Sequence, residues 1–241
     1  LRAQGLHVGS DKKGGMAILI HAAKNYRVWI LFGAYAACFG IEIFIHNIVA
    51  MYYVDHFKFG LKEAGMAAGI FGLLALFARA LGGIVSDKVA TKKGLDGRTK
   101  VLFAMILLEG VFLIVFSQMN TAILAILVMT VFALFTHMAC GATYALVPFI
   151  DRDALGGVAG IIGAGGNVGA VAAGFLLKGM LDIQTTLMVL GGLVVIAASC
   201  VLMIRFSVEH KEKEQKLFEA AVLERNSMEQ NAVSLKQNSA T

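Results

Sequence analysis

The sequence is poor in the residues that mark most soluble and extracellular proteins. Its 241 residues include one proline, three cysteines and one tryptophan, and only 15% of them are charged. Three isolated thiols form neither a disulfide framework nor a zinc-binding spacing. Disordered chains are rich in proline and charge, so this class is excluded as well. Because soluble proteins average about 25% charged residues, an ordinary cytosolic enzyme is also disfavoured.

Apolar and small residues take the place of the missing ones. Hydrophobic residues make up 58% of the chain, glycine occurs 27 times, and the mean hydropathy is +0.76. A transmembrane helix needs about 20 mostly apolar residues. Six stretches fit this description: Val28–Val54, Leu61–Val85, Val101–Phe116, Thr121–Phe149, Gly156–Leu177 and Thr185–Ile204. The sequence therefore predicts an all-α membrane protein with six transmembrane helices.

The lysines and arginines predict how these helices are oriented. Of 21 such residues, 17 lie on the side that carries both ends of the chain, and three lie on the opposite side. By the positive-inside rule, both ends are cytoplasmic. The net charge of +5 then belongs to the membrane border, so the bilayer is an expected partner and nucleic acid is not.

Three regions follow from this arrangement. We expect a cytoplasmic segment at 1–27, a membrane domain at 28–205 and a cytoplasmic tail at 206–241, in a plasma or bacterial inner membrane. The run from Glu209 to Lys216 predicts a solvated tail, with a regulatory or partner-binding helix as the alternative. The chain begins with Leu1 and shows no signal-peptide pattern, so we expect it to be a piece of a longer protein.

Ionisable side chains inside a span are costly and are therefore functional candidates. Arg79 is the sharpest case, about two turns before Asp87, where its span ends. A guanidinium is planar, permanently charged and offers paired donors to a planar oxyanion. One interpretation is a substrate-binding arginine. The alternative is a structural salt bridge to a carboxylate on another helix.

A second polar group lies in the first span. A spacing of four residues brings Glu42 near His46 on one helix, with Asn47 on the adjoining strip. We interpret these residues as a strip on a transport pathway, with Glu42 or His46 able to carry a proton. The alternative is that His46 and Asn47 are merely solvated near the external surface.

Two further intramembrane groups are given structural roles. Glu109 stands alone in its span, where a protonated carboxyl would hydrogen-bond between helices. His137 lies close to Cys140 in sequence but has no third ligand, so no metal site is expected.

The fifth stretch is unusually rich in glycine. The pairs Gly156/Gly160 and Gly165/Gly169 favour close helix contact. The run only loosely matches a dinucleotide fingerprint and has no preceding strand, so we exclude nucleotide binding and expect no cofactor. Close packing alone is one interpretation. The other is an anion site, in which bare backbone lets a ligand approach and the amide of Asn167 donates to it.

These segments resemble the nitrate/nitrite porter family of the major facilitator superfamily. Gly82–Lys88, read Gly-Gly-Ile-Val-Ser-Asp-Lys, is similar to the superfamily's loop signature after a second helix. Gly163–Ala170, read Gly-Ala-Gly-Gly-Asn-Val-Gly-Ala, resembles the family's nitrate signature. Ala145–Ile150 and Cys38–Glu42 also resemble segments of that family. The resemblance covers about residues 20–205.

The resemblance implies that the chain is the carboxyl-terminal six-helix half of a twelve-helix transporter. In the family, one arginine from each half clamps nitrate at the midplane, and Arg79 occupies that position here. Its partner would come from the missing amino-terminal half. Asn167 matches the signature, together with Gly163, Gly165 and Gly166. Phe32 falls where some members have a substrate-contacting tyrosine, with Tyr35 nearby, and Asn47 completes the expected substrate contacts.

The resulting hypothesis is a secondary transporter of nitrate and/or nitrite that works by alternating access. Asp87, with Arg98 or Lys88, is expected to latch its cytoplasmic side, and Glu42 and His46 to serve gating or coupling. A facilitator for another small organic anion is one alternative, and a non-transporting membrane sensor or scaffold is another. An enzyme is not expected, since no nucleophile–base pair or metal set can be assembled.

Overall fold

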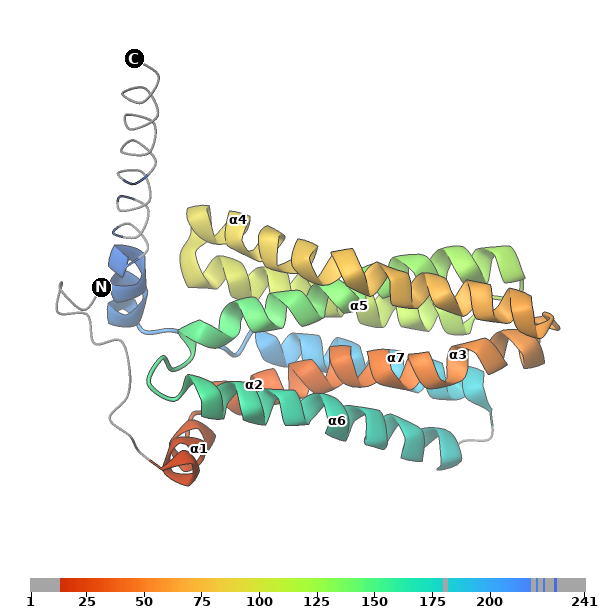
Figure 1. Ribbon diagram of the computed structural model, residues 1–241, viewed down its shortest axis with the longest axis horizontal. Coiled ribbons are helices and arrows are strands. Elements are labelled where there is room, and N and C mark those ends of the chain that lie inside the picture. Colours follow the sequence, from red (N-terminus) through yellow and green to blue (C-terminus); the bar gives the residue numbers. More distant parts are fainter. Residues whose placement is uncertain (1–13, 180–181, 218–219, 221–222, 224–227, 229–241) are drawn as a thin grey trace, which may run out of the picture. The chain divides into compact units, whose positions relative to one another are not determined.

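The computed structural model describes residues 14–179 and 182–217, together with residues 220, 223 and 228. This part of the chain is helical and contains no strand, which confirms the predicted all-α class (Figure 1). The elements are α1 (Gly15–Ala23), α2 (Tyr26–Tyr35), η2 (Ala36–Gly40), α3 (Ile41–Phe57), α4 (Leu61–Ser117), α5 (Ala122–Leu146), η3 (Val147–Phe149), α6 (Leu155–Gly179) and α7 (Ile183–Val201). Phe218, Ala221 and Val222, which would share one side of the alternative tail helix, lie outside the described residues.

The first predicted span is one continuous helical run made of α2, η2 and α3. It begins at the Asn25 side chain, which accepts a hydrogen bond from the Arg27 amide at 3.1 Å. It ends at Lys58, whose left-handed φ of 58° terminates the helix. In its middle, η2 is a π-helical turn over Ala36–Gly40. Such turns interrupt α-helices most often at functional sites.

Helix α4 contains both the second and the third predicted spans. For this reason, the described residues contain five separate helices long and apolar enough to cross a membrane, rather than six. The chain reverses within α4 at Gly94, where φ is 56° and ψ is −147°, a conformation that favours glycine. Figure 1 shows the chain turning back at this point, so that the two limbs of α4 run in opposite directions. The segment 86–100, predicted to be a loop, is therefore helical on both sides of one glycine, because its polar residues remain compatible with a helix outside the membrane.

The bundle is held together by glycine contacts between helices. Helix α5 packs mainly on α4, α7 also packs on α4, and α6 packs on α2 and η2. A side chain at Gly82 would collide with the Met138 backbone, and one at Gly141 with the Arg79 backbone. Glycines allow such close approach between membrane helices. The contact between α4 and α5 therefore fixes the position of Arg79.

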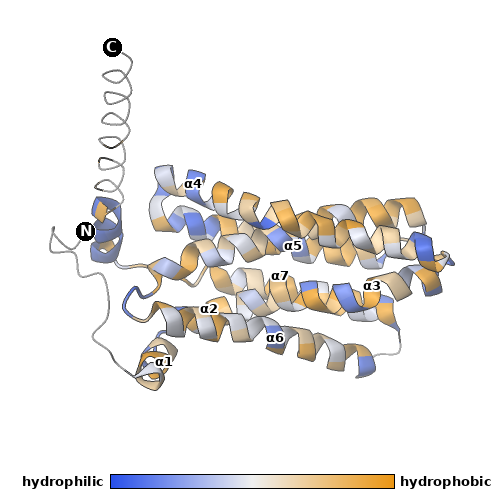
Figure 2. Cartoon of the chain, in the orientation of Figure 1, coloured by the Kyte–Doolittle hydropathy of each residue, from blue (hydrophilic) through white to orange (hydrophobic). Residues whose placement is uncertain are grey.

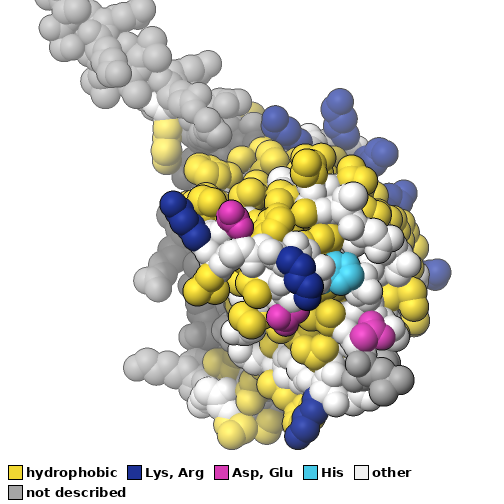
Figure 3. Space-filling model, turned by 90° about the vertical axis from the view of Figure 1, so that its right-hand side faces the viewer, with side chains coloured by type: hydrophobic (Ala, Val, Ile, Leu, Met, Phe, Trp, Pro, Cys, Tyr) yellow, Lys and Arg dark blue, Asp and Glu magenta, His cyan; other side chains and the backbone are white. Residues whose placement is uncertain are grey.

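Hydrophobic residues line the length of the helices, and hydrophilic residues gather toward both ends of the bundle (Figure 2). Figure 3 looks onto the end where α3 joins α4, and its basic side chains stand apart from one another. This end carries Lys58 and Lys62, which the sequence analysis assigned to the lysine-poor side of the membrane.

The segment expected to be a cytoplasmic loop at 1–27 contains the short helix α1. It packs against the start of α6, where a Cβ atom on Gly157 would lie 2.9 Å from the Ile18 carbonyl oxygen. His21 on α1 also contacts the Asp151 carboxylate, with Nε2 and Oδ2 3.1 Å apart. Residues 1–204 form one compact unit, and residues 205–241 form a second, in which 208–217 is helical.

Candidate anion site

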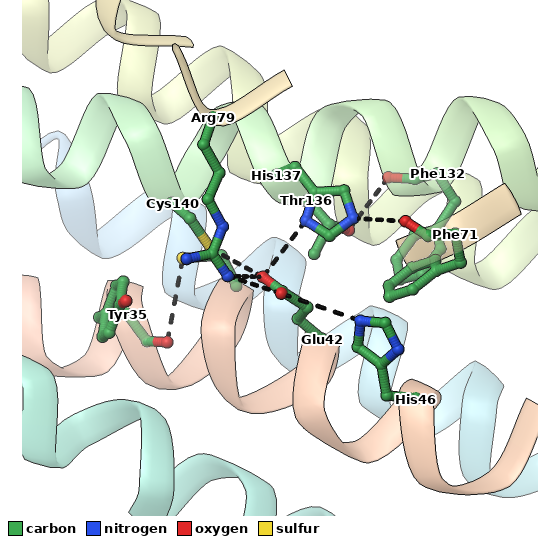
Figure 4. A network of polar contacts seen from close by, with 10 residues as sticks. Tyr35, Glu42, His46, Phe71, Arg79, Phe132, Thr136, His137 and Cys140 are labelled. Carbon is green, nitrogen blue, oxygen red and sulfur yellow. Dashed lines mark hydrogen bonds and ion pairs between the residues drawn. The ribbon is translucent and has the colours of Figure 1, made fainter. Parts of the chain in front are cut away.

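The intramembrane arginine is paired with the intramembrane glutamate. Nη2 of Arg79, on the first limb of α4, donates to both carboxylate oxygens of Glu42 on α3, at 2.6 and 2.8 Å (Figure 4). The Glu42 side chain is only 6% exposed, whereas the Arg79 side chain is 39% exposed. The carboxylate on another helix, which the sequence left open as the partner of Arg79, is therefore Glu42.

Arg79 keeps unused capacity to bind an anion. In the described part of the chain, only Nη2 takes part in hydrogen bonds, and Nε is buried without a hydrogen-bond partner. The guanidinium carbon lies 5.2 Å from the centroid of the Phe39 ring, which stacks on Tyr35. A partly exposed cation beside an aromatic face can bind a small planar anion through its guanidinium donors.

Helix α5 adds two groups to the Glu42 carboxylate. Nδ1 of His137 lies 3.3 Å from Glu42 Oε2, and the Cys140 thiol donates to the same oxygen at 3.5 Å. On the far side of the imidazole, Nε2 of His137 lies 2.9 Å from the Phe71 carbonyl oxygen. Glu42, Arg79, His137 and Cys140 thus form one polar cluster from three helices. We call it the Glu42 cluster.

The predicted neighbours of Glu42 on its own helix differ from one another. Nε2 of His46 lies 4.0 Å from Glu42 Oε1, so the two residues are adjacent, as their spacing predicts, although His46 remains 42% exposed. Asn47 is exposed, and its side-chain amide donates to the Ile43 carbonyl one turn earlier at 2.8 Å. That bond uses one of the two amide hydrogens, which leaves the other for a ligand.

The glycine-rich helix α6 packs against the first helical run at glycines where the sequence predicted ligand contact. A side chain at Gly165 would meet the Phe32 backbone, and one at Gly166 would meet the Phe39 ring. In this structure the first helical run lies against the bare backbone at both positions. Gly163 is more open, with the Tyr144 hydroxyl 3.3 Å from the position of a Cβ atom. Asn167 is exposed on α6.

The aromatic residues predicted near the substrate come from α2. Tyr35 is buried and makes an edge contact with Tyr144 of α5, with ring centroids 5.1 Å apart. Phe32 is partly exposed and contacts the Trp29 ring at 5.6 Å. Of these two residues, Tyr35 lies closer to the Glu42 cluster, through its stacking on Phe39.

A second ion pair lies where α4 reverses. Nη1 of Arg98 is 2.6 Å from Asp87 Oδ1, and the guanidinium carbon lies 4.7 Å from the Phe149 ring centroid. Asp87 therefore pairs with Arg98, the first of the two partners that the sequence allowed. Lys88 is exposed, and its backbone carbonyl accepts a hydrogen bond from Thr91.

His137, Cys140 and Phe39 are the members of this site to which sequence reasoning gave no part in binding an anion. His137 was considered only as a metal ligand, and among the described residues no group of three metal-binding side chains occurs. The available signal was the presence of three polar residues, Thr136, His137 and Cys140, close together in an apolar span. Its partner on α3 lies 95 residues earlier, so spacing alone does not reveal the contact.

Comparisons with known proteins agree with this architecture. The model of the Major Facilitator Superfamily matches residues 29–237. The chain is 42% identical over 183 residues to the high affinity nitrate transporter 2.5 of Arabidopsis thaliana, covering 76% of this chain and 36% of that protein. It is 42% identical to nitrate transporter 2.2 of Chlamydomonas reinhardtii, covering 61% and 29% of the two chains. It is 34% identical to a nitrate/nitrite transporter of Picosynechococcus, covering 61% and 27%.

These alignments span about a third of the length of each relative. The range matched by the superfamily model contains the helices that carry the Glu42 cluster and the glycine-rich α6. The chain belongs to the major facilitator superfamily and, within it, to the nitrate/nitrite porter family.

Proposed function

We propose that this chain is the carboxyl-terminal six-helix half of a transporter that carries nitrate and/or nitrite across a cell membrane. Arg79 supplies the positive charge of its half of the anion site. The observation that carries the proposal is a partly exposed arginine inside a membrane bundle, in a chain whose relatives are named as nitrate transporters. Positive charge and hydrogen-bond donors are what a small anion needs to replace its hydration.

The remaining contacts come from the helices around Arg79. Asn167 and Gly163 on α6 and Asn47 on α3 provide polar or open positions, and Phe32 and Tyr35 line the aromatic side of the site. A second arginine comes from the amino-terminal half, which is the partner this half needs to close the pathway. Two facing arginines repel each other, and a monoanion bound between them offsets part of this repulsion and so draws the halves together.

Transport proceeds by alternating access, as one half rocks against the other around a midplane site. The pair Asp87–Arg98 stabilises the contact between α4 and Phe149, at the end of the bundle that we place in the cytoplasm. Both ends of this chain lie on that side. Breaking and remaking this ion pair accompanies the change between inward-open and outward-open states.

Uptake of labelled nitrate into proteoliposomes tests the proposal, using the full-length protein that carries this chain. Arg79→Ala removes hydrogen bonds to a charged group, which contribute about 1.5–3 kcal/mol, or roughly 10- to 150-fold in affinity. Arg27→Ala removes an arginine near the start of α2 and serves as the matched control.

We expect nitrate uptake that nitrite inhibits, that Arg79→Ala lowers by roughly 10- to 150-fold at subsaturating nitrate and that Arg27→Ala preserves. Inhibition by formate or acetate in place of nitrite would instead support a facilitator for organic anions. Absence of anion uptake by well-folded wild-type protein would favour a non-transporting module, in which Arg79 and Glu42 only hold helices together.

A further inference from the structure

The arginine assigned to the substrate is already occupied by an anion of the protein itself. Nη2 of Arg79 donates to both oxygens of the Glu42 carboxylate, which is almost fully buried (Figure 4). Carboxylate and nitrate are both planar monoanions that accept hydrogen bonds through neighbouring oxygens. They therefore compete for the same donors, and Nη2 cannot serve both fully.

The second partner of Glu42 offers it an alternative bond. His137 Nε2 lies 2.9 Å from the Phe71 carbonyl oxygen, which can only accept, so Nε2 carries the hydrogen. In a neutral imidazole the other nitrogen, Nδ1, then holds a lone pair. This Nδ1 lies 3.3 Å from Glu42 Oε2 and has no hydrogen-bond partner, although His137 is fully buried. Glu42 Oε2 and His137 Nδ1 are then both acceptors, so a hydrogen bond between them requires one added proton.

We propose that Glu42 is a tethered competitor of the transported anion, and that it releases Arg79 when it takes up a proton and donates it to His137 Nδ1. This inference rests on the proposed function. The proton bonds to one carboxylate oxygen, Glu42 becomes neutral, and the Nη2 hydrogens are free for the anion. Before the exchange, Arg79 and Glu42 sum to zero charge. Afterwards Arg79 and the bound anion sum to zero, so no uncompensated charge is created in the low-dielectric interior.

The other groups around Glu42 are compatible with this exchange. The Cys140 thiol donates to Glu42 Oε2 and is neutral when it does so. The partly exposed His46 lies beside Oε1, where it gives the carboxyl a neighbour in contact with solvent. The only ionisable side chain in the sequence of α6 is Lys178, in its last turn. The titratable and charged groups that face or electrostatically influence Glu42 are Arg79, His137, Cys140, His46 and Glu109.

Calorimetry of nitrate binding to the purified full-length protein tests the proposal across about two pH units. If one proton enters with each anion, the dissociation constant rises about tenfold for each unit of pH increase. Repeating the titration in buffers of different ionisation enthalpy counts the protons taken up directly. We expect about one proton per nitrate for the wild-type protein.

Glu42→Gln has the shape of the protonated acid but cannot take up a proton. We expect it to bind nitrate with an affinity independent of pH and to take up no proton. Glu109→Gln is the matched control, because Glu109 is another buried intramembrane carboxyl with no hydrogen-bond partner for either oxygen. This variant should keep the tenfold dependence and the uptake of one proton.

Three results would overturn the inference. The first is wild-type binding that is equally tight at every pH, with no proton uptake, and the second is a Glu42→Gln variant that keeps the wild-type dependence. The third is absence of nitrate binding by folded wild-type protein at every pH, which refutes the proposed substrate as well. The proton count on the wild-type protein requires no variant, so it decides the question even if Glu42→Gln lowers stability.

Discussion

Replacing Gly40 with alanine tests how closely η2 and α6 approach beside the Glu42 cluster. A Cβ atom at Gly40 would lie 2.8 Å from the Cα and carbonyl carbon of Gly169, and 2.9 Å from the Ala170 nitrogen. Ordinary van der Waals contact begins near 3.4 Å, so the two backbones must separate by roughly 0.6 Å. All three neighbours are backbone atoms, and no flexible side chain can move aside.

The expected free-energy change combines two opposing effects. Overpacking costs about 1–3 kcal/mol. Alanine in place of a helical glycine contributes about 0.5–1 kcal/mol of stability. Gly33→Ala in α2 is the matched control, because a Cβ atom there meets nothing within 4 Å. We therefore expect Gly33→Ala to stabilise the protein and Gly40→Ala to be less stable than that control by about 1–3 kcal/mol.

Thermal unfolding of the purified variants measures this difference. For a chain of this size, 1 kcal/mol corresponds to about 2–4 °C, so the melting temperatures should differ by roughly 2–12 °C. If Gly40→Ala melts at or above the temperature of Gly33→Ala, the close backbone contact is not present in the folded protein. The packing role given to Gly169 would then be wrong as well.

Three further predictions concern the ends of the bundle. Arg98→Ala removes the ion pair with Asp87 and the contact with the Phe149 ring. We expect a loss of roughly 1 kcal/mol, which lowers the melting temperature by about 2–4 °C. The control Lys88→Ala should change the melting temperature little. Asp182 caps α7 by accepting hydrogen bonds from the Thr185 amide and hydroxyl, which hold the pKa of its carboxyl below the usual range. This stabilisation is fully present above the unfolded-state pKa of about 3.9, and it is lost as pH falls through the lower folded-state pKa. The melting temperatures of wild type and Asp182→Ala should therefore differ at neutral pH and converge in acid. Trp29, the only tryptophan, is 52% exposed and donates a hydrogen bond to the Ala23 carbonyl. We expect it to lie at the membrane interface, so lipids brominated near the head group should quench its fluorescence more than lipids brominated at the chain end. Equal quenching by both lipids would contradict an interfacial position.

The helical class of this protein and the ionisable residues inside its membrane spans were predictable from local sequence. Hydropathy alone marks the membrane helices, and a charge in an apolar run such as Arg79 stands out without any structure. Membership in a family of transporters also confirms the expectation that the chain is not an enzyme. The four-residue spacing was enough to place His46 beside Glu42.

Contacts between helices were beyond the reach of sequence patterns. The partners Arg79 and Glu42 are 37 residues apart, and their meeting depends on the rotation of two helices about their axes. In the same way, many glycines interrupt the apolar runs, yet among the described glycines Gly94 alone takes a positive φ. Whether a glycine makes a reversal or a close packing contact is decided by its neighbours in space, and Gly165 and Gly166 show the second outcome.

The π-helical turn η2 sets how far α3 is rotated relative to α2 about the axis of the first helical run. An α-helix advances by about 100° per residue, so one extra residue in a turn rotates everything beyond it by about that angle. Tyr35 precedes the turn and Glu42 follows it. Deleting a single residue of Ala36–Gly40 would restore a regular helix and swing Glu42 away from Arg79, with Tyr35 left in place. The geometry of the ion pair is thus encoded partly in the length of a segment that contains neither of its members.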